Sequence, residues 1–456
     1  MSVVAPVLSH EFSGILQTVR DAAVPQRTGA ISKVLGLRFD VEGLDLPIGA
    51  TVRVLDRDID LSGEVVAVGA GSVTCMPFGE VKGLRVGARV SGSEKPSSIG
   101  VGPQLLGRVI DALGRPLDDK GPIPGLVDVE IDGEPPHPLR RAKVDLPMSL
   151  GVRAWDTLIP AGRGQRVGVF AGSGVGKSTL MGMIARNTAA DVNVVALIGE
   201  RGREVREFVE SDLGPEGLAR SVLVIATSDS PALVRLRAAF VATRIAEYFR
   251  DQGNDVMLMM DSLTRFCMAQ REIGLSAGEP PTSRGYPPSV FSLLPRLLER
   301  AGAAERGSIT GLYTVLVDGD DHNEPISDAA RSILDGHVVL SRKLAHANHY
   351  PAIDVLASIS RVSGAVTTPE QRRLMGELRQ LMAAEAEARD LIEIGAYVPG
   401  TNLVVDRAVA LREPIRDFLC QFVDEHWNAA QSFERLGNLL ASQDNANTVA
   451  RMGGRQ

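Results

Sequence analysis

The chain has 456 residues, of which 44% are apolar and 23% are charged, and its formal net charge is −7. This composition is typical of a globular protein, and the length exceeds what one hydrophobic core holds, so we expect about two to four compact units. The acidic balance and the aromatic content of only 4% argue against a nucleic-acid-binding protein that depends on basic grooves and base stacking.

The bulk properties also predict a location. Cys75, Cys267 and Cys420 lie far apart in the sequence and form no metal-ligand pair, which is typical of small buried residues in a reducing cytosol. The N-terminal stretch MSVVAPVLSHEF has neither the basic region nor the long apolar core of a signal peptide. No uncharged apolar run approaches the roughly 18 residues of a membrane span. We therefore expect a soluble cytosolic protein that can still contact a membrane surface.

The N-terminal segment 1–24 contains a predicted amphipathic helix. Between residues 8 and 19 apolar side chains recur at helical spacing, and Ser9 is a candidate N-cap. A single apolar stripe can pack on its own domain, or it can dock a partner or a lipid surface, and the sequence leaves these alternatives open. The residues of the stripe are Leu8, Phe12, Ile15, Leu16 and Val19.

Residues 25–95 are predicted to form a small β-domain. Short β-rich pieces separated by Gly and Asp are typical of a small antiparallel barrel or sandwich. These pieces are ATVRVL, GEVVAVG, SVTCMPF and GARVSG. The following stretch, residues 93–150, is rich in Gly and Pro, and we expect a connecting layer there.

An α/β domain is expected over residues 96–368 and a helical domain over residues 369–456. From about residue 165 to about residue 341, apolar runs alternate with amphipathic helical patterns, which indicates a parallel sheet covered on both faces. Right-handed crossovers bring the C-terminal ends of such strands to one edge of the sheet. The expected strands are RVGVF, VNVVALIG, SVLVIAT, VMLMMD, LYTVLV and HVVLS.

The first of these strands leads into AGSGVGKSTL, a phosphate-binding loop pattern in which Ala171 replaces the usual first glycine. Its glycines let the backbone curl around phosphates, and the following helix N-terminus attracts anions. Lys177 is placed to reach the β- and γ-phosphates, and Ser178 to offer a hydroxyl to Mg²⁺. The predicted nucleotide-binding residues are Gly172, Ser173, Gly174, Val175, Gly176, Lys177, Ser178 and Thr179.

Acidic residues follow two other predicted strands. Asp261 ends VMLMMD, where a carboxylate that holds the Mg²⁺ shell is expected. Glu200 ends the strand that follows the loop helix, so its tip should lie near Lys177. Hydrolysis needs a carboxylate to orient and deprotonate a water, and Glu200 is the candidate, with Arg201 beside it to meet the phosphate or hold the carboxylate. A solvated surface ion pair is the alternative for Glu200 and Arg201.

Long motifs over residues 28–440 closely resemble the type III protein-export ATPases, flagellar and injectisome, which are relatives of the catalytic β subunit of rotary ATP synthases. The resemblance implies a RecA-like P-loop core with an N-terminal β-barrel and a C-terminal helical domain, and a homohexameric ring with ATP and Mg²⁺ at each interface. The motifs are AGSGVGKST, IGERGREVREF, MMDSLTRF, MAQREIGLSAGEPPTSRGYPPSVFSLLPRLLERAG, GSITGLYTVLVDGDDHNEPISDAARSILDGHVVLSR and HYPAIDVLASISR.

The same resemblance implies roles for individual residues. Lys177 and Ser178 bind phosphate and Mg²⁺, Glu200 is the catalytic carboxylate, and the side chains of Arg201 and Arg265 lie near the phosphates. Tyr350 resembles the tyrosine that stacks on adenine, and Arg361 resembles the arginine finger that enters the neighbouring subunit's site. From the residues alone, Tyr350 is a core residue and Arg361 an exposed strand-end arginine. The departures are Ala171 and Glu385, which replaces a frequent tyrosine, so no second wall of the adenine pocket is assigned.

Three functions are compatible with these motifs. The first is an export ATPase that releases chaperones from cargo and unfolds it, with the flagellar system preferred over the injectisome. The second is a non-catalytic nucleotide-binding ring subunit, which Glu200 argues against. The third is a ring-shaped RNA helicase, which the acidic charge argues against. For the first function, the expected partners are a stator-like protein at residues 8–19, a central-stalk-like protein in the pore, export-gate membrane proteins and chaperone–cargo complexes. We expect the protein to work in the cytoplasm at the inner face of the cytoplasmic membrane. No specific nucleic acid is expected as a partner.

Overall fold

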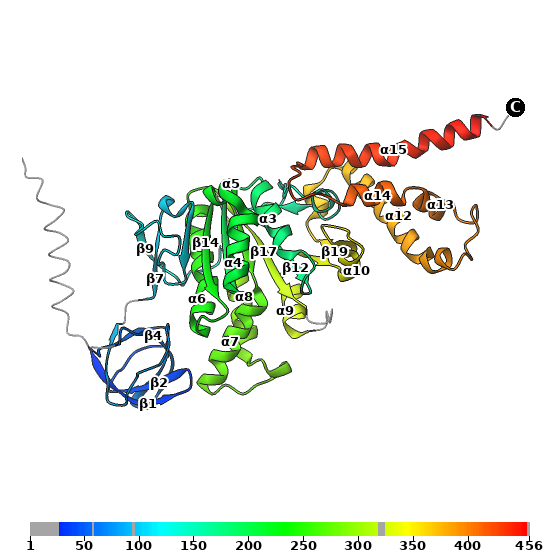
Figure 1. The fold of residues 1–456 in the computed structure, drawn as a ribbon. Helices are drawn as coiled ribbons and strands as arrows, with labels where there is room; N and C mark the ends of the chain where they lie inside the picture. The colour runs from blue at the N-terminus through cyan, green and yellow to red at the C-terminus, as the bar shows by residue number, and fades with distance from the viewer. Residues whose placement is uncertain (1–26, 57–58, 94–95, 318–323, 454–456) are drawn as a thin grey trace, which may run out of the picture. The chain divides into compact units, whose positions relative to one another are not determined.

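The computed structural model describes residues 27–56, 59–93, 96–317 and 324–453, with side chains as far as residue 441 (Figure 1). The helix expected at residues 8–19 lies outside these ranges. The chain divides into two compact units, Met1–Ser97 and Ser98–Gln456, and each is described by itself. Among the residues described, no helix is long and apolar enough to cross a membrane.

The first unit contains a closed antiparallel barrel with the strand order β1-β2-β5-β4-β3-β6, as the short β-rich pieces predicted. Its interior is filled by alternate apolar residues of each strand, such as Val41, Val65 and Val73, which are at most 1% exposed. Cys75 belongs to this core, as expected for a small buried residue. The strands are β1 (Thr28–Leu35), β2 (Arg38–Glu42), β3 (Thr51–Val54), β4 (Ser62–Gly69), β5 (Ser72–Pro77) and β6 (Arg89–Ser93).

The second unit is built on a sheet with the order β19-β18-β12-β17-β15-β13-β14-β8. Its strands are parallel, except that β19 runs antiparallel to β18 and the short β16 pairs antiparallel with β17. The predicted parallel sheet is therefore confirmed, and its two edge strands are β19 and β8. The strands are β8 (Arg108–Asp111), β12 (Arg166–Ala171), β13 (Val192–Glu200), β14 (Ser221–Thr227), β15 (Asp255–Asp261), β16 (Gly302–Ala303), β17 (Ser308–Leu316), β18 (Gly336–Leu340) and β19 (Ile353–Ser360).

Residues 93–150, expected to form a connecting layer, also contribute a strand to the main sheet. Within this stretch, β8 joins the edge of the main sheet beside β14. Its apolar residues Val109 and Ile110 are 7% and 0% exposed. Burial against the sheet therefore stabilises this strand, which is too short to show a periodic pattern in the sequence. The other elements of the segment are β7 (Ser98–Val101) paired with β9 (Val127–Glu130), η1 (Pro103–Leu105), and β10 (Pro147–Met148), which pairs with β11 (Ala161–Gly162).

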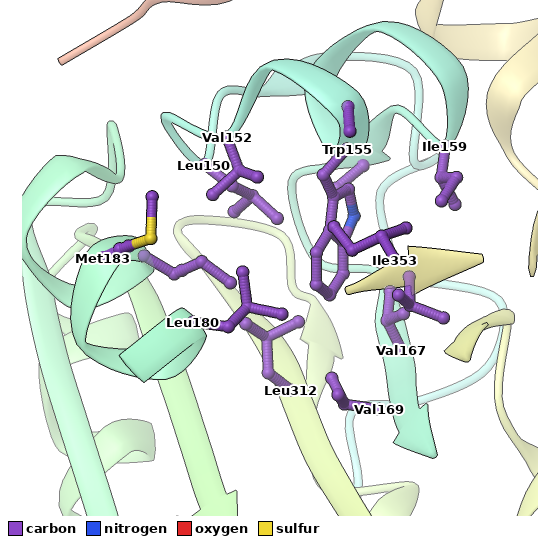
Figure 2. Close-up of a cluster of buried hydrophobic side chains, with 14 of the residues drawn as sticks. Leu150, Val152, Trp155, Ile159, Val167, Val169, Leu180, Met183, Leu312 and Ile353 are labelled. Carbon is purple, nitrogen blue, oxygen red and sulfur yellow. The ribbon is translucent and has the colours of Figure 1, made fainter. Parts of the chain in front are cut away.

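Helices cover both faces of the sheet. The long helix α6 packs against β13, β14 and β15 on one face. On the other face the buried cluster of Figure 2 surrounds the indole of Trp155, between Leu180 of α3, Ile353 of β19 and Val167 of β12. The helices of this part are α2 (Arg153–Leu158), α3 (Lys177–Asn187), α4 (Gly202–Glu207), the π-helical η2 (Phe208–Leu213), α5 (Gly214–Ala219), α6 (Ala232–Asp251), α7 (Leu263–Ala277), η3 (Ser283–Gly285), α8 (Pro288–Leu298), α9 (Pro325–Ile333), α10 (Arg342–His346) and α11 (Ser363–Val366).

The C-terminal part is helical and packs on the same core. Thr368 is the N-cap of α12, where its hydroxyl accepts from the Gln371 backbone and the Gln371 side chain returns a bond, so a capping box starts this helix. Leu378 of α12 and Leu436 of α15 are both fully buried in the cluster that also contains Trp155. The helices are α12 (Pro369–Glu393), α13 (Leu403–Ala410), α14 (Arg412–Leu419) and α15 (Ala429–Gly453), drawn in orange to red in Figure 1.

Candidate nucleotide-binding site

The phosphate-binding loop connects β12 to α3 at the C-terminal edge of the sheet. Gly176, the N-cap of α3, has a φ of 84°, a left-handed conformation that favours glycine. Val175 is buried at 2% exposure and anchors the loop, whereas Ser173 and Gly174 are exposed. The loop therefore presents backbone amides and the first turn of α3 to solvent, which is the arrangement that binds phosphate.

Lys177 is the first residue of α3, and its side chain is directed at two carboxylates from neighbouring strands. Its Nζ pairs with the Asp261 carboxylate and lies 3.5 Å from Glu200 Oε1. Burial alone would lower the pKa of Lys177, but Asp261 and Glu200 outweigh it and raise that pKa. The lysine is thus fully charged and is held by carboxylates at the place where a bound phosphate would compete for it.

Asp261 ends β15 and is 3% exposed. Besides Lys177, its carboxylate accepts a 2.7 Å hydrogen bond from the hydroxyl of Thr314 on β17. Ser262 then caps α7, so the first turn of that helix begins directly at the strand end. The sequence did not indicate Thr314, because a threonine inside a buried strand carries no motif and only the β15–β17 pairing brings it to Asp261.

Glu200 ends β13 and is 8% exposed, so it is not the solvated surface residue of the alternative interpretation. Burial raises its pKa above the ordinary value of 4.5, and a hydrogen bond with Glu204 raises it further, against the lowering effect of Lys177 and Arg265. Arg265 donates to the Gly199 carbonyl at 2.8 Å. Gly199 has a φ of 72°, and a side chain there would meet Arg265 atoms at 3.1 Å, so glycine is required just before Glu200.

The structure does not bring Arg201 to the carboxylate of Glu200. The Arg201 side chain is 79% exposed and pairs with Glu204 at 3.6 Å, one turn along α4. Its partner Glu204 is the residue that contacts Glu200, so the connection between Arg201 and the site is indirect. Glu204 is a further residue that the sequence did not indicate, although it stands at helical spacing from Glu200.

The oxygen donors around the loop fit a magnesium ion. Within the described part of the chain no group of three or more His, Cys, Asp or Glu could hold a metal by itself. Mg²⁺ at a nucleotide site does not need such a group, because it is bound through one or two protein oxygens together with phosphates and waters. The exposed hydroxyl of Ser178 and the carboxylate of Asp261 supply that donor set beside Lys177.

A pocket of about 970 Å³ continues from the loop toward the C-terminal helices. Tyr350 lines it, and the Tyr350 ring lies 3.4 Å from the position that a Cβ on Gly176 would occupy. Phe422 lines the same pocket and is 77% exposed. Two aromatic rings beside a phosphate-binding loop can hold a nucleobase by stacking. Phe422 is a candidate for the second wall, which the sequence left unassigned because residues 420–428 have no periodic pattern.

Arg361 lies elsewhere. It follows β19, and its backbone amide donates to the carbonyl of Asp335, just before β18 begins. The guanidinium is exposed and donates to the Arg331 carbonyl at 3.2 Å. Arg361 therefore belongs to the N-terminal edge of the sheet, and the structure does not bring it to the phosphate-binding loop of its own chain.

Fold and site together define a P-loop nucleotide-binding protein with a RecA-like sheet. Comparison with family models refines this class. Residues 31–93 match the β-barrel domain of the ATP synthase alpha/beta family, and residues 151–360 match its nucleotide-binding domain. Residues 367–438 match the T3SS EscN ATPase C-terminal domain.

Individual relatives extend over nearly the whole chain. A flagellum-specific ATP synthase of Bacillus subtilis is 49% identical over 92% of this chain and 96% of its own. A type 3 secretion system ATPase of Xanthomonas euvesicatoria is 52% identical over 92% and 95%. The assembled ATPase EscN of enteropathogenic E. coli superposes with a TM-score of 0.87 at 47% identity, over 90% of this chain and 99% of that one. The chain therefore belongs to the family of flagellum-specific ATP synthases and type 3 secretion system ATPases.

Proposed function

We propose that this chain is a Mg-ATP hydrolase that works at the subunit interfaces of a homohexamer in a type III protein-export apparatus. The observation that carries the proposal is the buried carboxylate of Glu200, whose Oε1 lies 3.5 Å from the Nζ of Lys177. A non-catalytic ring subunit binds nucleotide without such a carboxylate, so Glu200 favours the catalytic reading. The family names of the relatives support the same activity.

The residues of the site divide the work. The loop amides, Lys177 and Arg265 bind and orient the phosphates, and the positive charge offsets the negative charge that develops on the transferred group. When bound, Mg²⁺ would be held by Ser178 and Asp261, and it would supply positive charge that offsets the charge of the phosphates. Phosphate binding releases Lys177 from its pairs with Asp261 and Glu200, which leaves both carboxylates available.

Glu200 then acts as the general base. Its carboxylate orients a water in line with the γ-phosphate and takes a proton from that water as the water oxygen attacks the γ-phosphorus. The bond from this phosphorus to the β,γ-bridging oxygen breaks in the same step, and ADP leaves with that oxygen. Burial raises the pKa of Glu200 above its ordinary value, and a base with a raised pKa is better matched to proton transfer near neutral pH. We assign Arg201 no contact with phosphate in the isolated subunit, because it is exposed and paired with Glu204.

The remaining cation comes from the next subunit in this proposal. Arg361 lies at the edge of the sheet away from its own Lys177, and a head-to-tail ring places that edge against the neighbour's loop. An arginine supplied in trans is worth about 10³ to 10⁵ in rate. One related structure is described as an assembled ATPase in complex with its central stalk EscO, which supports a ring and a stalk-like partner for this chain.

The proposal also includes a cellular location, partners and an export system. We place the chain in the cytoplasm at the inner face of the membrane, where it releases chaperones from cargo for an export gate, and residues 8–19 bind a stator-like partner. Flagellar export is our preferred system, with the injectisome as the alternative. Deletion of the gene in the source organism tests this: loss of flagellar filaments supports the first, and intact filaments with lost effector secretion support the second.

Purified protein tests the activity itself. We expect steady ATP turnover that requires Mg²⁺ and is unaffected by added RNA. Intact ATP binding with no turnover would instead identify a non-catalytic ring subunit, and RNA-stimulated turnover at physiological salt would favour a ring helicase.

A further inference from the structure

Residues 420–428 join α14 to α15 and carry part of the wall of the nucleotide pocket; we call them the pocket loop. Five of its residues line the pocket together with the phosphate-binding loop, although the two segments are more than 200 residues apart in the chain. The loop contains no regular secondary structure, so side chains from other elements must fix its position. The lining residues of the pocket loop are Cys420, Gln421, Phe422, Val423 and Glu425.

One buried arginine holds this loop. Arg153, the first residue of α2, is 2% exposed, and its guanidinium is directed at the chain around the end of α14. Its Nε donates to the Phe418 carbonyl at 3.0 Å, and its terminal nitrogens donate to the Cys420 carbonyl and to the Glu425 carboxylate, the latter at 2.5 Å. The same guanidinium lies 4.7 Å from the centre of the Trp427 ring. Arg153 therefore contacts the pocket loop near both of its ends.

Further bonds fix the middle of the loop to the nucleotide-binding core. The Gln421 side chain accepts from the Arg153 amide at 2.9 Å and donates to the Gly151 carbonyl at 2.9 Å. The backbone N–H of Gln421 donates to the Tyr350 carbonyl at 2.9 Å, which joins the loop to the aromatic residue beside Gly176. At the far end of α3, Arg186 donates to the Val423 carbonyl at 2.9 Å. Phe422 is thus held on both sides while its own ring stays exposed.

We propose that Arg153 is a positioning residue for nucleotide binding, which sets the place of Phe422 relative to Tyr350 by fixing the pocket loop to the nucleotide-binding core. This inference rests on the proposed ATP hydrolase function and deepens it. The planar fork of arginine satisfies several carbonyls and one carboxylate at once, and a lysine in its place supplies a single point of charge. Arg153 itself lines the pocket, and its hydrogen bonds go to the end of α14 and to the pocket loop. We therefore expect it to act on nucleotide affinity rather than on the chemical step.

The competing explanation is that Arg153 only attaches the C-terminal helices to the core. Arg379 provides a matched control, because it bridges the same parts of the molecule away from the pocket. Its guanidinium, from α12, donates to the Leu158 carbonyl at the other end of α2 at 3.0 Å and to the Ser358 carbonyl at 3.1 Å. A merely structural role predicts the same kinetic behaviour when either arginine is replaced.

The test compares the wild type with Arg153→Met, Arg153→Lys and Arg379→Met. We expect Arg153→Met to raise the KM for ATP about tenfold or more, as the loss of charge-assisted hydrogen bonds implies, while kcat changes less than about twofold. Arg153→Lys should fall between Arg153→Met and the wild type. Arg379→Met should leave KM unchanged, even where it lowers the melting temperature. Glu425→Gln, which weakens one contact of Arg153 at a half-exposed position, serves if Arg153→Met does not fold, and it should raise KM in the same direction.

Tryptophan fluorescence gives a readout that does not require turnover. The sequence has two tryptophans, and Trp155 is buried in the core, so a change on titration with ADP that disappears in Trp427→Phe reports the pocket loop. We expect the midpoint of that change to move to higher ADP concentration in Arg153→Met and not in Arg379→Met. Folded Arg153→Met and Glu425→Gln proteins with wild-type KM and midpoint would overturn the inference. A wild type that binds ADP but hydrolyses no ATP would contradict the proposed function instead.

Discussion

Lys177 and Arg361 lie at opposite edges of the same sheet. Lys177 follows the C-terminal end of β12, whereas Arg361 follows β19, whose last residue pairs with the first residue of β18. Because β18 runs parallel to β12 with His337 opposite Gly168, the end of β19 lies beside Val167, which is roughly 13 Å from the C-terminal end of β12 at about 3.3 Å per residue. One chain therefore does not bring Arg361 to its own Lys177, which is the arrangement that the proposed head-to-tail ring requires.

Replacing the proposed base tests the chemical step. Glu200→Gln keeps the shape of the side chain but removes its ability to take a proton, so kcat should fall by about 10² to 10⁴ with ATP binding retained. Glu210→Gln is the matched control, because Glu210 is an exposed glutamate on the following helical segment that pairs with Arg206. Rates measured under saturating ATP decide the matter, and a Glu200→Gln enzyme within a factor of ten of wild type would remove Glu200 from the mechanism.

The pH dependence of kcat/KM should report the raised pKa of Glu200. The base works only when ionised, so activity is lost as pH falls through this pKa, and the acidic limb should lie above the ordinary glutamate value of 4.5. Glu204→Gln removes a neighbour that raises the pKa, so the limb should move to lower pH. A limb that stays in place or moves to higher pH in this variant would contradict the assignment.

The aromatic walls should control affinity for the nucleotide. Phe422→Ala and Tyr350→Ala each remove a stacking surface worth about 1 kcal/mol, so each should raise the KM for ATP several-fold with little change in kcat. Leu139→Ala provides the control, because Leu139 is 91% exposed and does not line the pocket. If Phe422→Ala leaves KM unchanged, Phe422 is a surface residue rather than a wall of the site.

The buried ion pair between Arg300 and Glu247 should contribute measurably to the free energy of unfolding. Arg300 and Glu247 are 2% and 1% exposed at the side chain and are joined by two hydrogen bonds of 2.7 Å. Among the described residues, Arg300→Met leaves Glu247 paired with only the more exposed Arg244, which should cost about 3 kcal/mol and, in a unit as large as Ser98–Gln456, lower Tm by roughly 3–5 °C. Calorimetry should show partial recovery when Glu247→Gln is added; a further additive loss would mean that the pair is not coupled.

The sequence predicted the parts of the site that are defined by motifs at strand ends. Lys177, Glu200 and Asp261 were expected to converge because parallel strands bring their C-terminal ends to one edge, and they do. The parallel sheet itself follows from continuous apolar runs such as that of β13, whose residues are all buried.

What the sequence missed depends on contacts between distant segments. Phe422 and Arg153 come together only when the C-terminal helices pack on the core, and no local pattern records such packing. The edge strand β8 is too short for a periodic signal. Arg201 was expected to meet the phosphate or to hold the Glu200 carboxylate; in the structure its side chain is exposed and pairs with Glu204, and a contact with phosphate stays a prediction.

In the proposed ring one subunit supplies Arg361 to the site of the next, and the decisive measurement is the ATPase rate per subunit as a function of protein concentration. We expect a steep rise over the range in which the ring assembles, and a low rate at every concentration for an Arg361→Ala protein that still assembles and binds ATP. The rise reflects completion of the site by the neighbouring arginine. Wild-type protein that is demonstrably monomeric and hydrolyses ATP as fast as the assembled ring, or an Arg361→Ala ring of full activity, would contradict the claim.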